Sequence, residues 1–88
     1  GEEVSNALSA YQTAQEQVKT RLLQVKELEK AVENTDYLFK LGNETTYLET
    51  LTAQESLLSA QLALISDRFD QVQSAITLYQ ALGGGREN

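Results

Sequence analysis

Carboxylates, hydroxyls and lysines are the side chains in this sequence that could do acid–base or metal chemistry, because the chain has no histidine and no cysteine. Without those two residue types, the common zinc, haem and nucleophile–base sites lack their ligands or their bases. Glu44 and Glu49 lie near Gly42 and could line a cation site. Alternatively, Glu49 caps its own helix and Glu44 is solvated, which is the interpretation we favour. We therefore expect no catalytic residue, no cofactor and no metal site, and a protein that is not an enzyme.

Charge and hydropathy restrict the partners of the chain. Its net charge is −6, whereas binding to a nucleic-acid backbone needs clustered lysines and arginines, so we expect no nucleic acid partner. No apolar run reaches the ~20 residues that a membrane-spanning helix needs. The first residues, GEEVSNAL, also lack the basic and apolar regions of a signal peptide. We expect a soluble segment that does not itself span a membrane and that is excised from a longer protein.

Apolar residues recur every seven positions on both sides of Gly42, in a chain without proline. This spacing predicts a coiled coil. In the second half, a further apolar stripe lies on another helix face, and a helix with two apolar stripes usually has two partners. The first array is Val4, Tyr11, Val18, Val25, Val32 and Phe39; the second is Leu48, Leu51, Leu58, Leu62, Ile65, Phe69, Val72, Ile76 and Tyr79; the further stripe is Ala53, Leu57, Ala60 and Leu64.

Local signals around Gly42 predict a turn between two helices. Glycine suits the left-handed position just past a helix C-terminus, and Lys40 would complement the helix dipole in the last turn. Thr46 followed by Glu49 fits a capping box, which starts a new helix. A stop signal followed closely by a start signal favours a hairpin over one kinked helix.

The sequence thus predicts an all-α fold, a long antiparallel two-helix coiled-coil hairpin with helices at about 4–41 and 46–82, in a single domain, 1–88. In antiparallel register, residues whose numbers add up to about 87 should face each other. Val25 would then pack against Leu62, and the two main heptad arrays would form the contact. The further stripe would remain exposed, so we expect the excised hairpin to self-associate into a bundle.

Two runs of the sequence carry an ordered set of motifs: LFKLGNETTYLETLTAQESLLSAQL and DRFDQVQSAITLYQALGGG. The set comprises the turn glycine, the Tyr-Leu-Glu after it, two Ala-Gln pairs, an Asp-Arg pair and the closing Leu-Tyr-Gln-Ala-Leu-Gly-Gly-Gly. In this order the motifs resemble the C-terminal half of bacterial outer-membrane efflux proteins of the TolC-like family. The resemblance covers nearly the whole chain.

The resemblance implies a homotrimeric parent with a barrel in the bacterial outer membrane and a helical tunnel through the periplasm. This segment would be a periplasmic hairpin of that tunnel. Its tip would dock a periplasmic adaptor (membrane fusion) protein, which engages an inner-membrane pump, and would gate the export of small molecules in multidrug resistance. The resemblance places adaptor-docking residues at Leu41, Gly42, Asn43 and Glu44, and pore-constriction residues at Glu49 and Thr52.

The sequence departs from the family pattern at the tip. Phe39 stands where a tyrosine often makes a hydrogen bond that helps to close the entrance, and Thr52 stands where a second acid is common. The spacing from Gly42 to Ala53 is one residue longer than in the family prototypes. The residues also fit an alternative, a free-standing antiparallel coiled coil used for oligomerisation or as a scaffold.

Overall fold

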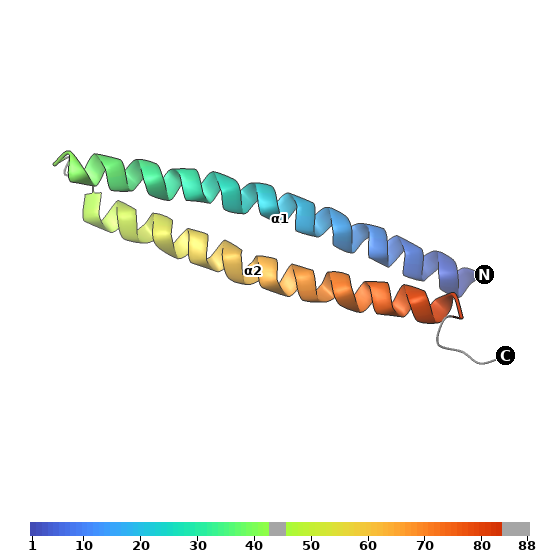
Figure 1. Cartoon of the computed structure of the whole chain (residues 1–88). Helices are drawn as coiled ribbons and strands as arrows, with labels where there is room; N and C mark the ends of the chain where they lie inside the picture. Colours follow the sequence, from blue (N-terminus) through green and yellow to red (C-terminus); the bar gives the residue numbers. More distant parts are fainter. Residues whose placement is uncertain (43–45, 84–88) are drawn as a thin grey trace.

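The computed structural model describes residues 1–42 and 46–83 of the chain, which form two long helices. Helix α1 spans Glu2–Lys40 and α2 spans Thr46–Ala81. The helices run antiparallel, side by side, so that the start of α1 and the end of α2 lie at the same end of the rod (Figure 1). At 1.5 Å per residue, α1 is about 58 Å long. The predicted helical hairpin and the bounds of its helices are confirmed.

Both helices end in the same way, on a glycine in the left-handed region. Gly42 has φ +82° and Gly83 has φ +84°. The backbone N–H of Gly42 donates to the carbonyl oxygen of Phe39 at 3.0 Å, and that of Gly83 donates to Gln80 at 2.9 Å. These bonds satisfy carbonyls that have no partner within the helix. The predicted glycine stop at the end of α1 is therefore confirmed, while the start signal at Thr46 rests on a side chain outside the described residues.

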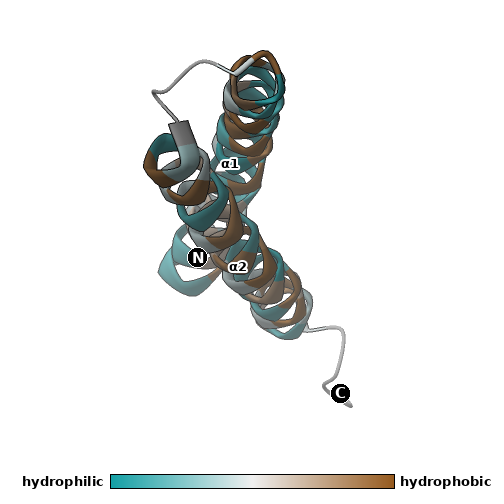
Figure 2. Ribbon diagram, turned by 90° about the vertical axis from the view of Figure 1, so that its left-hand side faces the viewer, coloured by the Kyte–Doolittle hydropathy of each residue, from teal (hydrophilic) through white to brown (hydrophobic). Residues whose placement is uncertain are grey.

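The contact between the helices, called the seam below, uses the predicted face of α1. The residues of its heptad array recur every seven positions, and Val18 and Val25 among them are buried. Ala7 and Ala14 lie three positions after Val4 and Tyr11 and are also buried. Hydrophobic and hydrophilic segments alternate along both ribbons (Figure 2), as expected for helices with one face in the seam. The first heptad array thus packs against α2, and Phe39, near the tip, remains 45% exposed.

The seam uses a different face of α2 from the one that the heptad array predicts. Leu62, expected opposite Val25, is 58% exposed, whereas Ala60 is 5% exposed. The further stripe therefore faces α1, and the prediction that the main array forms the contact is wrong. The seam positions of α2, all buried or half-buried, are Thr50, Ala53, Leu57, Ala60, Leu64, Asp67, Gln71, Ser74, Leu78 and Ala81.

Side-chain size explains this choice of face. Every second seam position of α2 is small or short (alanine, serine or aspartate), which lets the two helices approach closely and bury the valines and alanines of α1. The other array consists of leucine, isoleucine, valine and aromatic side chains, which would hold the helices further apart. We call that exposed array the lateral stripe; it comprises Leu48, Leu51, Leu58, Leu62, Ile65, Phe69, Val72, Ile76 and Tyr79.

The register of the hairpin is close to the predicted one. The side chains of Arg21 and Asp67 bond across the seam, so that residues whose numbers add up to about 88 lie opposite each other. One shallow groove is lined jointly by Leu28 and Ala60, and another by Ala14 and Ser74, which agrees with this register. The axial alignment of the helices was thus predictable, although the rotation of α2 about its own axis was not.

Candidate interaction surfaces

The hairpin tip lies where α1 ends, and its described residues are accessible. Leu41 is 65% exposed and Gly42 is also exposed. A Cβ added at Gly42 would meet no atom within 4 Å, so its surroundings would accept a side chain although its positive φ would not. Asn43 and Glu44, the other two predicted docking residues, lie outside the described residues. Backbone conformation, and not crowding, is therefore what calls for glycine at the tip.

Aromatic side chains surround the turn. The rings of Phe39 and Tyr47 have their centroids 6.2 Å apart and their planes inclined at 46°. Tyr37 is 62% exposed and Tyr47 is 65% exposed. An exposed, aromatic-rich end is a common feature of protein interaction sites. The sequence placed these residues near the turn, but their types alone did not predict the ring contact between α1 and α2.

Glu49 and Thr52, the predicted constriction residues, lie on the first two turns of α2 and are exposed. Their three-residue spacing places them on the same side of the helix. Glu49 also lies in the first turn, where a carboxylate complements the helix dipole. Thr52 lines a shallow groove between the helices together with Ser56 and Ser59. The structure thus groups the two residues on a polar face close to the tip.

Among residues 1–42 and 46–83, no group of three histidine, cysteine, aspartate or glutamate residues could hold a metal ion. Neither described helix combines the length and the hydropathy required to cross a membrane. The grooves on the rod are shallow. Its described surface offers long faces and an end for contact with other helices.

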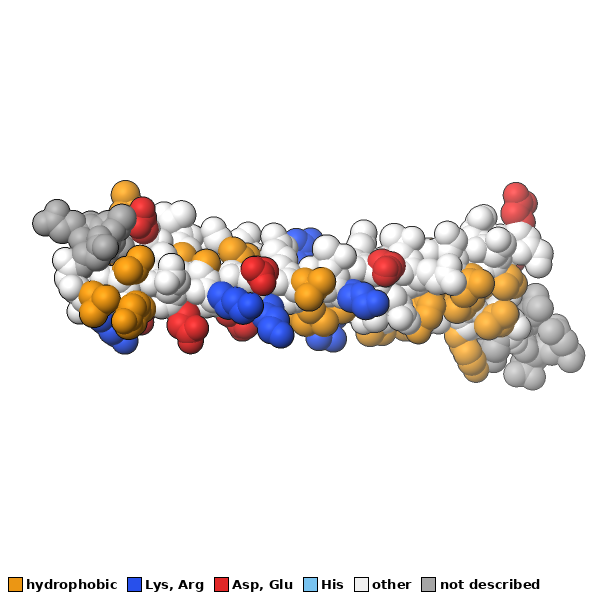
Figure 3. Space-filling view, turned by 90° about the horizontal axis from the view of Figure 1, so that it is seen from above, with side chains coloured by type: hydrophobic (Ala, Val, Ile, Leu, Met, Phe, Trp, Pro, Cys, Tyr) orange, Lys and Arg blue, Asp and Glu red, His pale blue; other side chains and the backbone are white. Residues whose placement is uncertain are grey.

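The lateral stripe is a long, exposed apolar face of α2. Its residues are between 39% (Leu51) and 74% (Leu48) exposed. From Leu58 to Tyr79 they recur at alternating spacings of four and three, which is the spacing of a coiled-coil contact, and Glu55 interrupts the series between Leu51 and Leu58. Hydrophobic side chains also reach the surface at several points on the side of the rod drawn in Figure 3. Since a monomeric protein rarely exposes so long an apolar surface, the stripe indicates contact with further helices.

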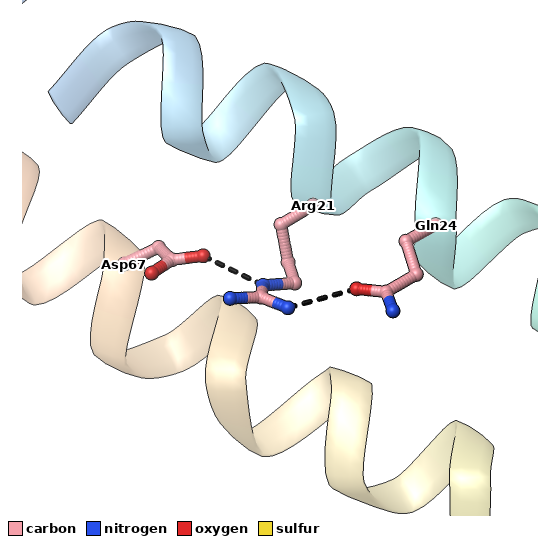
Figure 4. A network of polar contacts seen from close by, with 3 residues as sticks. All are labelled: Arg21, Gln24 and Asp67. Carbon is pink, nitrogen blue, oxygen red and sulfur yellow. Dashed lines mark hydrogen bonds and ion pairs between the residues drawn. The ribbon is translucent and has the colours of Figure 1, made fainter. Parts of the chain in front are cut away.

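Arg21 and Asp67 form a polar contact inside the seam (Figure 4). The Nε of Arg21 donates to Oδ2 of Asp67 at 2.8 Å, and its Nη1 donates to Oε1 of Gln24 at 2.8 Å. Asp67 is 8% exposed as a residue, and the side chain of Arg21 is 34% exposed. The sequence alone did not identify this pair. The position of Asp67, seven residues after Ala60 in the small-residue stripe, was the signal that could have found it.

Comparison with known proteins identifies the same family as the sequence motifs did, and the match extends over nearly the whole chain. Residues 1–84 match the model of the family described as "Outer membrane efflux protein". The "Toluene efflux pump outer membrane protein TtgC" of Pseudomonas putida is 38% identical over 86 residues, which are 96% of this chain and 17% of that protein. The "Probable efflux pump outer membrane protein SepC" of Pseudomonas putida is 34% identical over 92 residues, 98% of this chain and 18% of that protein.

A more distant relative comes from another organism. The "Cation efflux system protein CusC" of Escherichia coli is 30% identical over 83 residues, which are 94% of this chain and 18% of that protein. No solved structure matches the chain significantly. The chain thus spans less than a fifth of the length of these relatives, and it aligns with each of them over nearly its whole extent. The chain is a helical hairpin whose two helices pack along one seam and whose second helix exposes an apolar stripe, and it belongs to the outer membrane efflux protein family.

Proposed function

We propose that the chain is a periplasmic hairpin of the helical tunnel of an outer-membrane efflux duct. The observation that carries this proposal is the lateral stripe, which continues over almost all of α2 on a face that α1 does not cover. A helix in a tunnel wall contacts a neighbour on each side, and α2 has two apolar faces for that purpose. The whole segment 1–88 then serves as one structural unit of the wall.

In this proposal the lateral stripe packs against helices of the same duct, and the duct is a homotrimer. The heptad spacing of the stripe supports a helical partner, because side chains at such positions insert between those of a facing helix. The stripe includes Phe69 and Ile76, which are 68% and 45% exposed in the lone hairpin. Burial of these side chains would stabilise the assembled wall.

The tip docks a periplasmic adaptor protein, which in turn engages an inner-membrane pump. The proposed contacts are Leu41, Gly42, Asn43 and Glu44. The exposure of Leu41 and the aromatic surroundings of the turn support a docking surface with an apolar centre. The tip lies at the far end of the rod from the start of α1 and the end of α2, which suits a contact made end to end (Figure 1).

Glu49 and Thr52 line the narrowest part of the duct and take part in gating the export of small molecules. Both are exposed on a side of α2 that neither the seam nor the lateral stripe occupies. A ring of three symmetry-related glutamates would favour cations at such a constriction. The relatives' names refer to toluene in one case and to cations in another, so we assign no narrower class of substrate.

The proposal is tested in the full-length parent by placing a charge in the lateral stripe. Phe69→Glu should abolish trimer formation and efflux, because an unpaired carboxylate would have to be buried between helices. Gln73→Glu, on an exposed position four residues later, is the matched control and should leave both unchanged. A Phe69→Glu variant that still forms trimers and exports substrate at normal expression would contradict the proposal.

A further inference from the structure

Successive layers of the seam each consist of one residue of α1 and the residue of α2 that faces it. Arg21 and Asp67 form one such layer in an otherwise uncharged stretch of the seam. One heptad toward the tip, the corresponding layer pairs Leu28 with Ala60, and one heptad the other way it pairs Ala14 with Ser74. The buried side chains of these neighbouring layers are small or apolar. A charged layer therefore lies between two layers that carry no charge.

The uncharged layers alone leave the register of the two helices ambiguous. If α2 moved by seven residues along α1, the valines within α1 would still meet leucine, glutamine or threonine positions of α2, and the small positions that do not meet Arg21 or Asp67 would still meet short or apolar side chains. Heptad repeats are known to permit such shifts unless a polar residue in the contact opposes them. The apolar part of this seam hardly distinguishes one register from the next.

The charged layer does distinguish them. After a shift of one heptad, Asp67 would lie opposite Leu28 or Ala14, and Arg21 opposite Ala60 or Ser74. Asp67 is 8% exposed, so its carboxylate would remain largely buried without the guanidinium that now lies 2.8 Å away. A buried charge without a partner is strongly unfavourable, whereas an apolar pair in the same place tolerates the shift.

We propose that the Arg21–Asp67 ion pair determines the register of the hairpin and thereby fixes the axial position of the tip residues relative to the body of the rod. The turn at Gly42 is the other constraint on the register. Five residues connect the helices, however, and a few residues unwound from one helix and added to the other would accommodate a shift. The inference rests on the seam alone and is independent of the proposed function.

Disulfide cross-linking reads the register directly, because the chain has no cysteine of its own. Ala14→Cys with Ser74→Cys reports the observed register, and Ala14→Cys with Ala81→Cys or Ala7→Cys with Ser74→Cys reports the two shifted ones. A heptad shift moves a residue by about 10.5 Å along the helix, beyond the ~7 Å between Cα atoms that a disulfide can bridge. Each cysteine pair is introduced into the 88-residue chain, into an Arg21→Met/Asp67→Leu variant and into an Arg21→Asp/Asp67→Arg variant.

The unmodified seam and the exchanged pair should cross-link only in the observed register, whereas the apolar variant should give the shifted products as well, with unchanged helix content by circular dichroism. Exclusive cross-linking of the apolar variant at positions 14 and 74 would overturn the inference, since the turn would then suffice. Should the apolar variant lose its helix content, the single variant Arg21→Asp provides the test. Its two facing carboxylates should yield shifted products that Asp67→Arg suppresses, and a purely native pattern would again overturn the inference.

Discussion

Phe39, on the last turn of α1, and Tyr47, on the first turn of α2, hold their rings 6.2 Å apart across the turn, with the planes inclined at 46°. This contact joins the two helices at the end of the rod, beyond Val25, the last buried residue of α1. Phe39 has no hydroxyl, so its contribution there is ring packing. The tip is thus held by an aromatic contact that leaves both rings partly accessible to a partner.

We predict that Phe39 and Tyr47 are energetically coupled. A double-mutant cycle with Phe39→Ala and Tyr47→Ala should give a coupling of about 0.5 to 1 kcal/mol in the free energy of unfolding, the usual value for an inclined aromatic pair. Tyr37→Ala, at an exposed position on the same turn of α1, is the control and should not couple to Tyr47→Ala. Strictly additive losses for the first pair, measured by thermal or urea unfolding, would show that the ring contact contributes nothing.

Replacement of Gly42 should destabilise the hairpin through the backbone. Gly42→Ala is expected to cost about 1 kcal/mol of unfolding free energy, because an L-residue is strained at positive φ. The space around the position is open, so that crowding adds nothing to this loss. Gly42→Asn should cost less, since asparagine tolerates the left-handed region. An alanine variant that unfolds at the same urea concentration as the unmodified chain would refute this account.

The lateral stripe should make the isolated chain self-associate. Sedimentation of the 88-residue chain should reveal oligomers whose population grows with concentration, because helix association buries the exposed apolar side chains. Ile65→Glu should shift the distribution toward monomer, while Gln73→Glu, at an exposed position outside the stripe, should not. A well-folded chain that remains strictly monomeric at high concentration would count against the stripe as a contact surface.

The two faces of α2 should differ in their response to side-chain size. Ala60 is 5% exposed against α1, so Ala60→Leu should overpack the seam and cost about 1–3 kcal/mol of unfolding free energy. Leu58 is 56% exposed, and at concentrations where the chain is monomeric Leu58→Ala should change stability by no more than about 0.5 kcal/mol. Urea unfolding of both variants measures the contrast, and the reverse order of effects would place the main heptad array in the seam after all.

In the full-length parent, Glu49→Ala should lower the cation selectivity of the channel in planar bilayers. In the proposed trimeric duct, this variant removes a carboxylate from each of three subunits at the proposed constriction. Glu33→Ala, which removes an exposed acid from α1, is the control and should leave selectivity unchanged. Equal conductance and selectivity in the two variants and the unmodified channel would remove Glu49 from the pore.

The hairpin was predictable from the sequence, because the residues that end a helix or allow it to continue act at single positions. Gly42 and the absence of proline were sufficient to predict where α1 ends and that both helices are long. Heptad spacing then predicted a coiled coil and placed Val18 and Val25 in its contact. These features depend on one residue or on one helix, and they were predictable for that reason.

The face of α2 that contacts α1 was less accessible to the same reasoning. Two stripes on α2 are apolar, and the richer one was expected inside, since burial of Leu62 stabilises more than burial of Ala60 in isolation. The observed choice depends on how closely two helices can approach, which is a property of the pair. The ring contact of Phe39 with Tyr47 and the bond of Arg21 to Asp67 are likewise properties of two segments together.

The length of the rod has a mechanical consequence for its tip. A stiff lever about 58 Å long that tilts by about 5° moves its far end by about 5 Å, close to the 5.4 Å pitch of an α-helix. A small rotation at the end where α1 starts and α2 finishes is therefore amplified to a displacement of one helical turn at Gly42. A partner bound at the tip could therefore displace the tip with almost no deformation of the hairpin itself.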